Sequence, residues 1–180
     1  MKERIMKKIT IVGTAPGNGK GGISSALVGY LKGLEAHDVD YQFIESHCGG
    51  KSMVLLWLSA FFQVLKVAVS QRTNAIVWFH GAQWLSTIRK GSMAIVIRLF
   101  GGKAMYHLHS PAFHNYLNNS WLSKFLTKLA LMPYSHIVVL TPWWADFLKS
   151  HGIKKPMIVS ANPNSPHYCE LAQKFSDNGG

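Results

Sequence analysis

The sequence has no acidic residue between Glu45 and Asp146, although nine lysines and arginines fall in that interval. The whole chain of 180 residues carries 19 Lys and Arg against 8 Asp and Glu, a formal net charge of +11 at pH 7. Without an acid in this stretch no Ser-His-Asp triad can form there, so nucleophilic catalysis of that kind is not expected. The positive field attracts anions instead: nucleic acid, anionic lipid or phosphorylated substrates. An ordinary basic surface is the simpler alternative.

Patterns typical of nucleic-acid binding are also missing. The basic residues are spread singly through apolar segments, and the sequence contains no helix-turn-helix, zinc-finger or RNP-type pattern. Nucleic acid is therefore a less favoured partner than a membrane surface or a phosphate group.

Cysteine is scarce as well. Cys48 and Cys169 are far apart in the sequence and form no metal-binding pattern, which is typical of free thiols in a reducing compartment. The basic N-terminus is followed only by the short apolar run Ile9–Val12, which is too short for the core of a signal peptide. We expect a cytoplasmic protein, with a peripheral position at the inner face of the membrane as an option.

No uninterrupted apolar run approaches the length of about 20 residues that a membrane-spanning helix needs. The nearest is Met53–Val69, which is interrupted by Ser59, Gln63 and Lys66. A helix buried against a sheet, a helix at a membrane interface and a true span all fit this segment, in that order of preference. The segment Trp84–Phe100 mixes basic and apolar residues in a way that suits the rim of an anionic bilayer.

Short apolar runs alternate with longer helical stretches along the whole chain. The expected strands are Ile9–Gly13, Asp40–Glu45, Ala75–His80, Lys103–His109, Ser135–Leu140 and Ile158–Ser160. Strands that are apolar on both faces and separated by helices indicate a mainly parallel sheet with helices on both faces. The sequence therefore predicts a doubly wound, Rossmann-like α/β domain over residues 1–164. Residues 165–180 are expected to be a polar tail or the start of a linker.

The glycine-rich segment Gly13–Gly22 leads from the first expected strand into a helix, where backbone N–H groups can approach a phosphate. It is not a P-loop, because Gly21 follows Lys20 where Ser or Thr is required. The glycines within Gly17–Gly22 match GxGxxG formally, with Glu45 at about the distance of a ribose contact. That match begins too far beyond the strand, so a dinucleotide site is a minor alternative. A loop that needs glycine for its backbone angles is another.

Histidines and a serine stand where the third and fourth expected strands end. His80 closes one strand and His109-Ser110 closes the next, the positions where ligands of α/β sheets bind. His107 and His109 lie two residues apart on a strand and face the same side. No carboxylate or cysteine is near them in sequence, so a metal site is not expected.

Taken in order, four short segments give the chain a resemblance to the N-terminal half of retaining GT-B glycosyltransferases of the family-4 type. The segments are Gly21-Gly22-Ile23, Tyr106-His107-Leu108-His109-Ser110, Val138-Val139-Leu140-Thr141 followed by Trp144, and Val159-Ser160-Ala161-Asn162-Pro163. The resemblance implies one of two Rossmann-like domains that face a cleft. The first domain mainly holds the acceptor, and the second mainly holds the nucleotide-sugar.

The resemblance also implies roles for individual residues. Gly21 and Gly22 would lie near the donor diphosphate, His109 would lie beside the reacting sugar, and the Asn162-Pro163 element would close the first domain. His80, Ser110 and Asn162 are the candidates for the acceptor side. No cofactor beyond the nucleotide-sugar substrate is implied.

Because the family's donor-binding Arg, Lys and glutamates belong to the second domain, we expect the 180-residue chain not to transfer sugar alone. The partners expected are a nucleotide-sugar, a glycan or lipid-linked acceptor, a C-terminal glycosyltransferase half and an anionic membrane surface. A non-catalytic binding or regulatory subunit is the main alternative, and a dinucleotide-dependent oxidoreductase is a weaker one.

Overall fold

The computed structural model describes residues 8–17, 22–47 and 52–163. These residues form an all-parallel sheet of six strands in the order β2-β1-β3-β4-β5-β6. The strands are β1 (Ile9–Thr14), β2 (Tyr41–His47), β3 (Ile76–Gly81), β4 (Lys103–Leu108), β5 (His136–Val139) and β6 (Met157–Val159). All six expected strands are present, so the prediction of a doubly wound, Rossmann-like α/β fold is confirmed.

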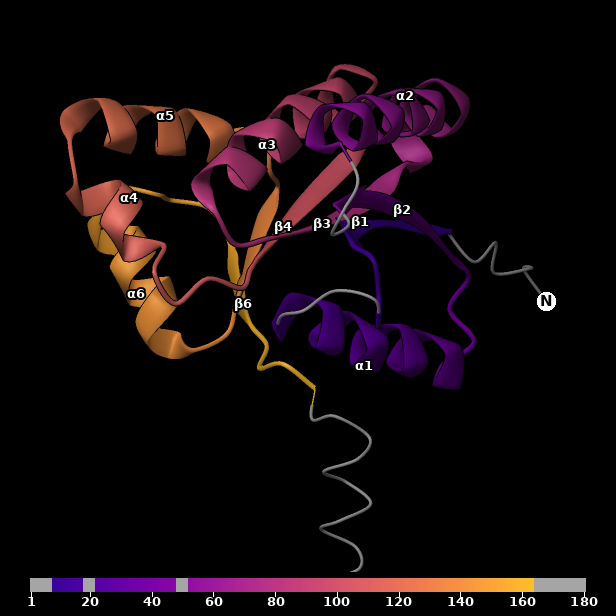
Figure 1. The fold of residues 1–180 in the computed structure, drawn as a ribbon, viewed down its shortest axis with the longest axis horizontal. Helices are drawn as coiled ribbons and strands as arrows, with labels where there is room; N and C mark the ends of the chain where they lie inside the picture. Colours follow the sequence, from indigo (N-terminus) through magenta and orange to yellow (C-terminus); the bar gives the residue numbers. More distant parts are fainter. Residues whose placement is uncertain (1–7, 18–21, 48–51, 164–180) are drawn as a thin grey trace, which may run out of the picture.

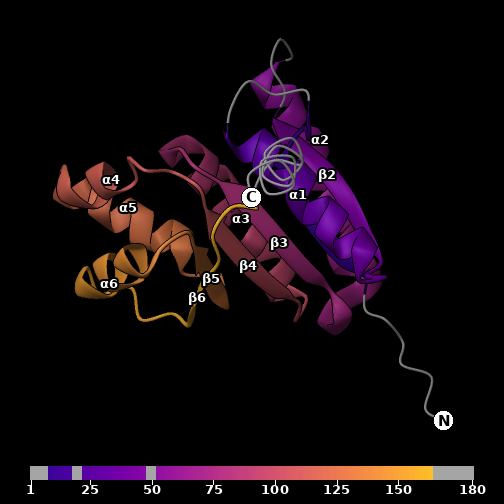
Figure 2. The ribbon, with the colours of Figure 1, turned by 90° about the horizontal axis from the view of Figure 1, so that it is seen from below.

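Helices connect the strands and cover both faces of the sheet (Figure 1). They are α1 (Gly22–Ala36), α2 (Met53–Gln71), α3 (Trp84–Leu99), α4 (His114–Asn118), α5 (Trp121–Leu131) and α6 (Pro142–Ser150), with a short 3-10 helix at Arg72–Asn74. Helix α1 lies on one face, and α2, α3 and α5 form a layer on the other. Helices α4, α5 and α6 gather at the β5 and β6 end of the sheet (Figure 2).

The main apolar core lies between the sheet and the layer of α2, α3 and α5. Val77 and Phe79 of β3 point into it, as do Tyr106 of β4 and Met93 of α3, and all four are fully buried. Helix α3 stops at the glycine pair Gly101-Gly102. Gly101 adopts a φ of +83°, and the Gly102 N–H donates to the Ile97 carbonyl at 2.9 Å, which satisfies a carbonyl of the last turn.

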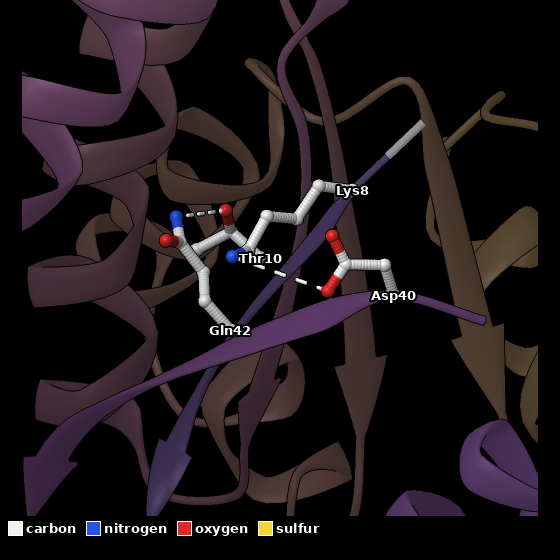
Figure 3. A network of polar contacts seen from close by, with 4 residues as sticks. All are labelled: Lys8, Thr10, Asp40 and Gln42. Atoms are coloured by element: carbon white, nitrogen blue, oxygen red, sulfur yellow. Dashed lines mark hydrogen bonds and ion pairs between the residues drawn. The ribbon is translucent and has the colours of Figure 1, made fainter. Parts of the chain in front are cut away.

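Polar contacts join β1 to β2 at the amino ends of the strands, away from the carboxyl edge (Figure 3). The Gln42 side-chain amide donates to Thr10 Oγ1 at 2.7 Å, and Lys8 Nζ lies 4.0 Å from Asp40 Oδ1. Because both charged side chains are well exposed, this ion pair contributes little to stability. The contacts fix the register of β2 at the edge of the sheet.

Helix α2 covers the sheet, as expected of the first of the three alternatives for this segment. Ala60, Val64, Val67 and Ala68 are buried against the core, as expected of a helix that covers a sheet. Elsewhere on the helix, exposed apolar residues such as Leu55 and Phe62 alternate with polar ones such as Lys66. By length and composition alone, Met53–Asn74 could span a membrane, a test that core helices of soluble proteins also pass.

Candidate functional site

The order of the strands reverses between β1 and β3, because the chain passes from β1 to β2 on one side and continues from β3 on the other. At such a switch point the loops from neighbouring strands diverge and leave a crevice at the carboxyl edge of a parallel sheet. A cavity of about 560 Å³ lies there. It is bordered by Thr14 at the end of β1, the start of α1, the end of β2, the first turns of α2, helix α3 and the segment after β4.

Lys90 of α3 is the most unusual residue of this cavity. It is only 4% exposed, and its Nζ donates to Ser86 Oγ at 2.7 Å. No carboxylate of the described residues forms an ion pair with it. Burial, with a smaller contribution from the neighbouring charge of Arg89, lowers the pKa of Lys90 from 10.5 to about 7. The amine is therefore partly charged at neutral pH and is poised to gain a proton when an anion binds.

Helical spacing in the sequence indicates that Lys90 lies on the buried side of α3. Thr87, Lys90, Met93, Ala94 and Ile97 recur at spacings of three and four and form the buried stripe of α3. A lysine on such a stripe either extends to solvent or points into a cavity. Here it lines the cavity, together with Arg89.

Three histidines form a cluster beside Lys90. The parallel register pairs His80 with His107, and His109 follows two residues later on the same face. The centroids of the imidazole rings of His107 and His109 are 4.1 Å apart, and His80 lies 5.1 Å from each. His80 Nδ1 and His109 Nε2 share a hydrogen bond of 2.9 Å.

Burial lowers the pKa of every histidine in this cluster, with further contributions from neighbouring positive groups. The pKa of His107 falls from 6.5 to about 3 and that of His109 to about 4, while that of His80 lies well below 6.5. All are therefore neutral at pH 7. Such imidazoles donate or accept hydrogen bonds but carry no charge.

Most of the residues predicted from sequence lie together. His80, His109 and Ser110 line the cavity. Asn162 lies beside His109, and its side chain partly offsets the lowering of the His109 pKa by burial. Gly22 lines the cavity where α1 begins. Gly21 lies outside the described residues. His107 contributes to the cluster but does not line the cavity.

The segment that contains Asn162 is fixed against α1. The Tyr30 hydroxyl donates to the Ala161 carbonyl at 3.0 Å. At Gly29 a Cβ atom would lie 2.6 Å from Pro163 Cβ, so only glycine allows this close approach. The segment after β6 thus returns to the carboxyl edge and places Asn162 near His109.

Chemically, the cavity offers cations, hydroxyls and neutral imidazoles. None of the described residues that line it is acidic. It is therefore suited to bind an anion and does not supply a carboxylate for acid-base chemistry. Glu45, the ribose contact of the dinucleotide alternative, is not among the residues that line it, which weakens that alternative.

Comparisons with known proteins do not assign this chain to a family. No protein-family model matches it, and no curated protein sequence matches it at a significant level.

Proposed function

We propose that this chain supplies the acceptor-side half of a glycosyltransferase site, and that its cavity binds a diphosphate group beside His109. The observation that carries the proposal is Lys90, a buried lysine without an acidic partner among the described residues, at the switch point of a parallel sheet. A buried ammonium group is costly unless an anion compensates it. An anionic ligand in the cavity is that compensation.

Two further features favour a diphosphate over a single negative charge. Arg89 lines the cavity next to Lys90, and the N-terminus of α1 borders it at Gly22. A helix N-terminus presents free backbone N–H groups and a partial positive charge to an anion. The cationic groups of α3 and the first turn of α1 therefore lie on different elements around one cavity, an arrangement suited to two linked phosphates.

His109 supports the assignment to sugar transfer. It lies in the segment Tyr106–Ser110 that resembles the glycosyltransferase pattern, and it lines the same cavity as Lys90. A neutral imidazole in this position hydrogen-bonds to a sugar hydroxyl and so orients the ring next to the diphosphate. In two-domain enzymes of this type, the remaining contacts to the donor come from the second domain.

A non-catalytic binding subunit with the same ligand is the alternative, and the lack of a carboxylate among the described lining residues favours it. In that case the cavity still binds the diphosphate. After a C-terminal glycosyltransferase half is added, no His109-dependent transfer of sugar is detected.

Calorimetric titration of the purified chain with three ligand classes tests the proposal. A nucleotide-sugar represents the donor, a short isoprenoid diphosphate represents a lipid-linked acceptor, and NAD represents the oxidoreductase alternative. We expect saturable binding of at least one of the first two and no binding of NAD. Binding of NAD alone, or of none of the three, would contradict the proposal.

The layer of α2, α3 and α5 carries an exposed apolar surface, which we call the apolar helical face. Its large side chains that are more than half exposed are Val54, Leu55, Phe62, Leu85, Leu99, Trp121 and Phe125. These helices carry lysines and arginines but no acidic residue, because all three lie within the interval between Glu45 and Asp146. Exposed apolar residues on helices that also carry basic residues suit the surface of an anionic membrane, where a lipid-linked acceptor would be found.

We expect the chain to float with anionic liposomes at low salt and to bind them less at high salt, because the electrostatic part of the attraction is screened. Replacing Trp121 and Phe125 together with serine removes apolar contact area from α5 and should abolish most of the binding. The matched control is Trp143→Ser, since Trp143 is 57% exposed but lies on α6, outside the apolar helical face. Equal loss in the control, or no binding at low salt, would refute the membrane proposal.

A further inference from the structure

The histidine cluster combines residues that the chain brings from two strands into one place. One ring nitrogen of each of His80, His107 and His109 can be chosen so that all three nitrogens lie within 4.8 Å of one another. His80 and His107 are fully buried, and His109 is 8% exposed. Adjacent strands in a parallel register, with a two-residue spacing on β4, hold the rings on one face of the sheet.

The cluster leaves ring nitrogens without hydrogen-bond partners among the residues that the structure describes. They are both nitrogens of His107, Nε2 of His80 and Nδ1 of His109. The backbone of Ser160 and the side chain of Asn162 lie near His107 and His109, but neither forms a hydrogen bond of ordinary geometry with these nitrogens. An unpartnered buried polar group destabilises the fold, so His107, with both nitrogens unpartnered, favours a ligand that its imidazole can bind.

We propose that His80, His107 and His109 form a binding site for a divalent transition-metal ion of the zinc type. The site goes beyond the proposed function and does not rest on it. Three imidazoles without a carboxylate suit Zn²⁺, Cu²⁺ or Ni²⁺, whereas Mg²⁺ and Ca²⁺ require oxygen ligands. Three histidines leave a further coordination position, as in zinc sites that bind an exchangeable ligand.

The distances allow this site after a small adjustment of the rings. Zinc–nitrogen bonds of about 2.0–2.1 Å in a tetrahedral arrangement place the ligand nitrogens roughly 3.4 Å apart. Nδ1 of His80 and Nε2 of His109, which share a hydrogen bond, are 2.9 Å apart, and a bound ion would replace that bond. The remaining separations, of at most 4.8 Å, shorten by rotation of the rings about χ1 and χ2.

The surroundings provide access and support. Because His80 and His109 line the cavity, an ion and a further ligand can enter from it. Trp78 stacks on His107 with an interplanar angle of 8°, and the Tyr30 ring lies 5.2 Å from the His107 ring, so both restrict the motion of this imidazole. Ser160 and Asn162 stand where they can receive the N–H groups that metal-bound imidazoles direct outward.

Titration of the chelator-treated chain with Zn²⁺ against a chromophoric chelator tests the site. We expect one equivalent to bind with a dissociation constant in the micromolar range and to raise the melting temperature. Co²⁺ in the same site should give the strong visible absorption of four-coordinate cobalt. The variants His107→Leu and His80→Gln should each lose the high-affinity equivalent, with circular dichroism used to verify the fold.

Controls separate this cluster from other metal-binding residues. His151→Gln and the double variant Cys48→Ser/Cys169→Ser should retain Zn²⁺ binding. Lys90→Met should also retain it while losing the diphosphate, so that the two proposals fail independently. The metal site is refuted if the wild-type chain binds no Zn²⁺, or if a folded His107→Leu or His80→Gln variant binds it as well as the wild type. If neither variant folds, the cobalt spectrum of the wild type decides, and an octahedral spectrum counts against the site.

Discussion

Replacing Lys90 with methionine is expected to raise the melting temperature by roughly 5–10 °C at about pH 6. Methionine fills a similar volume without a charge, so the energetic cost of burying an ammonium group disappears. A shift of the Lys90 pKa from 10.5 to about 7 corresponds to a destabilisation of a few kcal/mol by the charged form. The loss of one hydrogen bond to Ser86 offsets only about 1 kcal/mol of the gain.

The stabilisation by Lys90→Met should decrease as the pH rises. Below pH 7 Lys90 is protonated in both the folded and the unfolded chain, and the full cost lowers the free energy of unfolding. As the pH rises from 7 towards 10.5 the folded form loses its proton first, and the cost shrinks. The advantage of the Lys90→Met variant should therefore be largest near pH 6 and nearly absent near pH 10.

Thermal unfolding followed by circular dichroism across this pH range measures the effect. Lys66→Met is the matched control, because Lys66 is an exposed lysine on α2 and its replacement should change the melting temperature little. A Lys90→Met variant that is less stable than the wild type near pH 6 would mean that Lys90 is not buried as a charge.

The affinity for a nucleotide-sugar is expected to fall by roughly tenfold when the pH rises from about 6 to about 8.5. The two phosphates of this ligand keep the same charge over that range, so the change comes from the protein. Lys90 loses its proton on passing its pKa of about 7 and can no longer attract the diphosphate. A bound anion favours the protonated amine and so moves the transition to a somewhat higher pH.

The lowered pKa values of His80 and His109 keep both neutral at pH 6 and above, so neither produces this profile. His47 also lines the cavity, and the Lys90→Met variant separates the contribution of Lys90 from that of His47. The profile should be measured by calorimetry, with Lys90→Met showing weak and pH-independent binding. An affinity that is constant from pH 6 to 8.5 in the wild type would exclude Lys90 as the group that binds the diphosphate.

Much of the fold and part of the site could be predicted from the sequence. The apolar runs indicated all six strands, and parallel strands bring their carboxyl ends to one edge, which is why His80, His109 and Ser110 could be expected together. Asn162 was named as a candidate only through the family resemblance, which remains a prediction. In the structure it depends on the close contact of Pro163 with Gly29, which no local pattern reveals.

The remainder depended on three-dimensional register. The two-residue spacing of His107 and His109 indicates that they face the same side. The third histidine, His80, joins them because β3 pairs with β4 and places His80 opposite His107. The sequence does not reveal which strands are neighbours. Lys90 was grouped with the basic residues of an interfacial helix, although helical spacing places it on the buried stripe. The exposed apolar residues of α5 were overlooked because only the tertiary packing shows which face of that helix is left uncovered.

The central claim is that the cavity at the switch point binds a diphosphate through Lys90. Calorimetric titration of wild-type and Lys90→Met chains at about pH 6, with the nucleotide-sugar and the short isoprenoid diphosphate in parallel, tests it most directly. The account predicts saturable one-site binding to the wild type by at least one of these ligands, and a loss of at least tenfold in affinity in the variant. Equal affinity in the two chains, or no binding to the wild type, would contradict it.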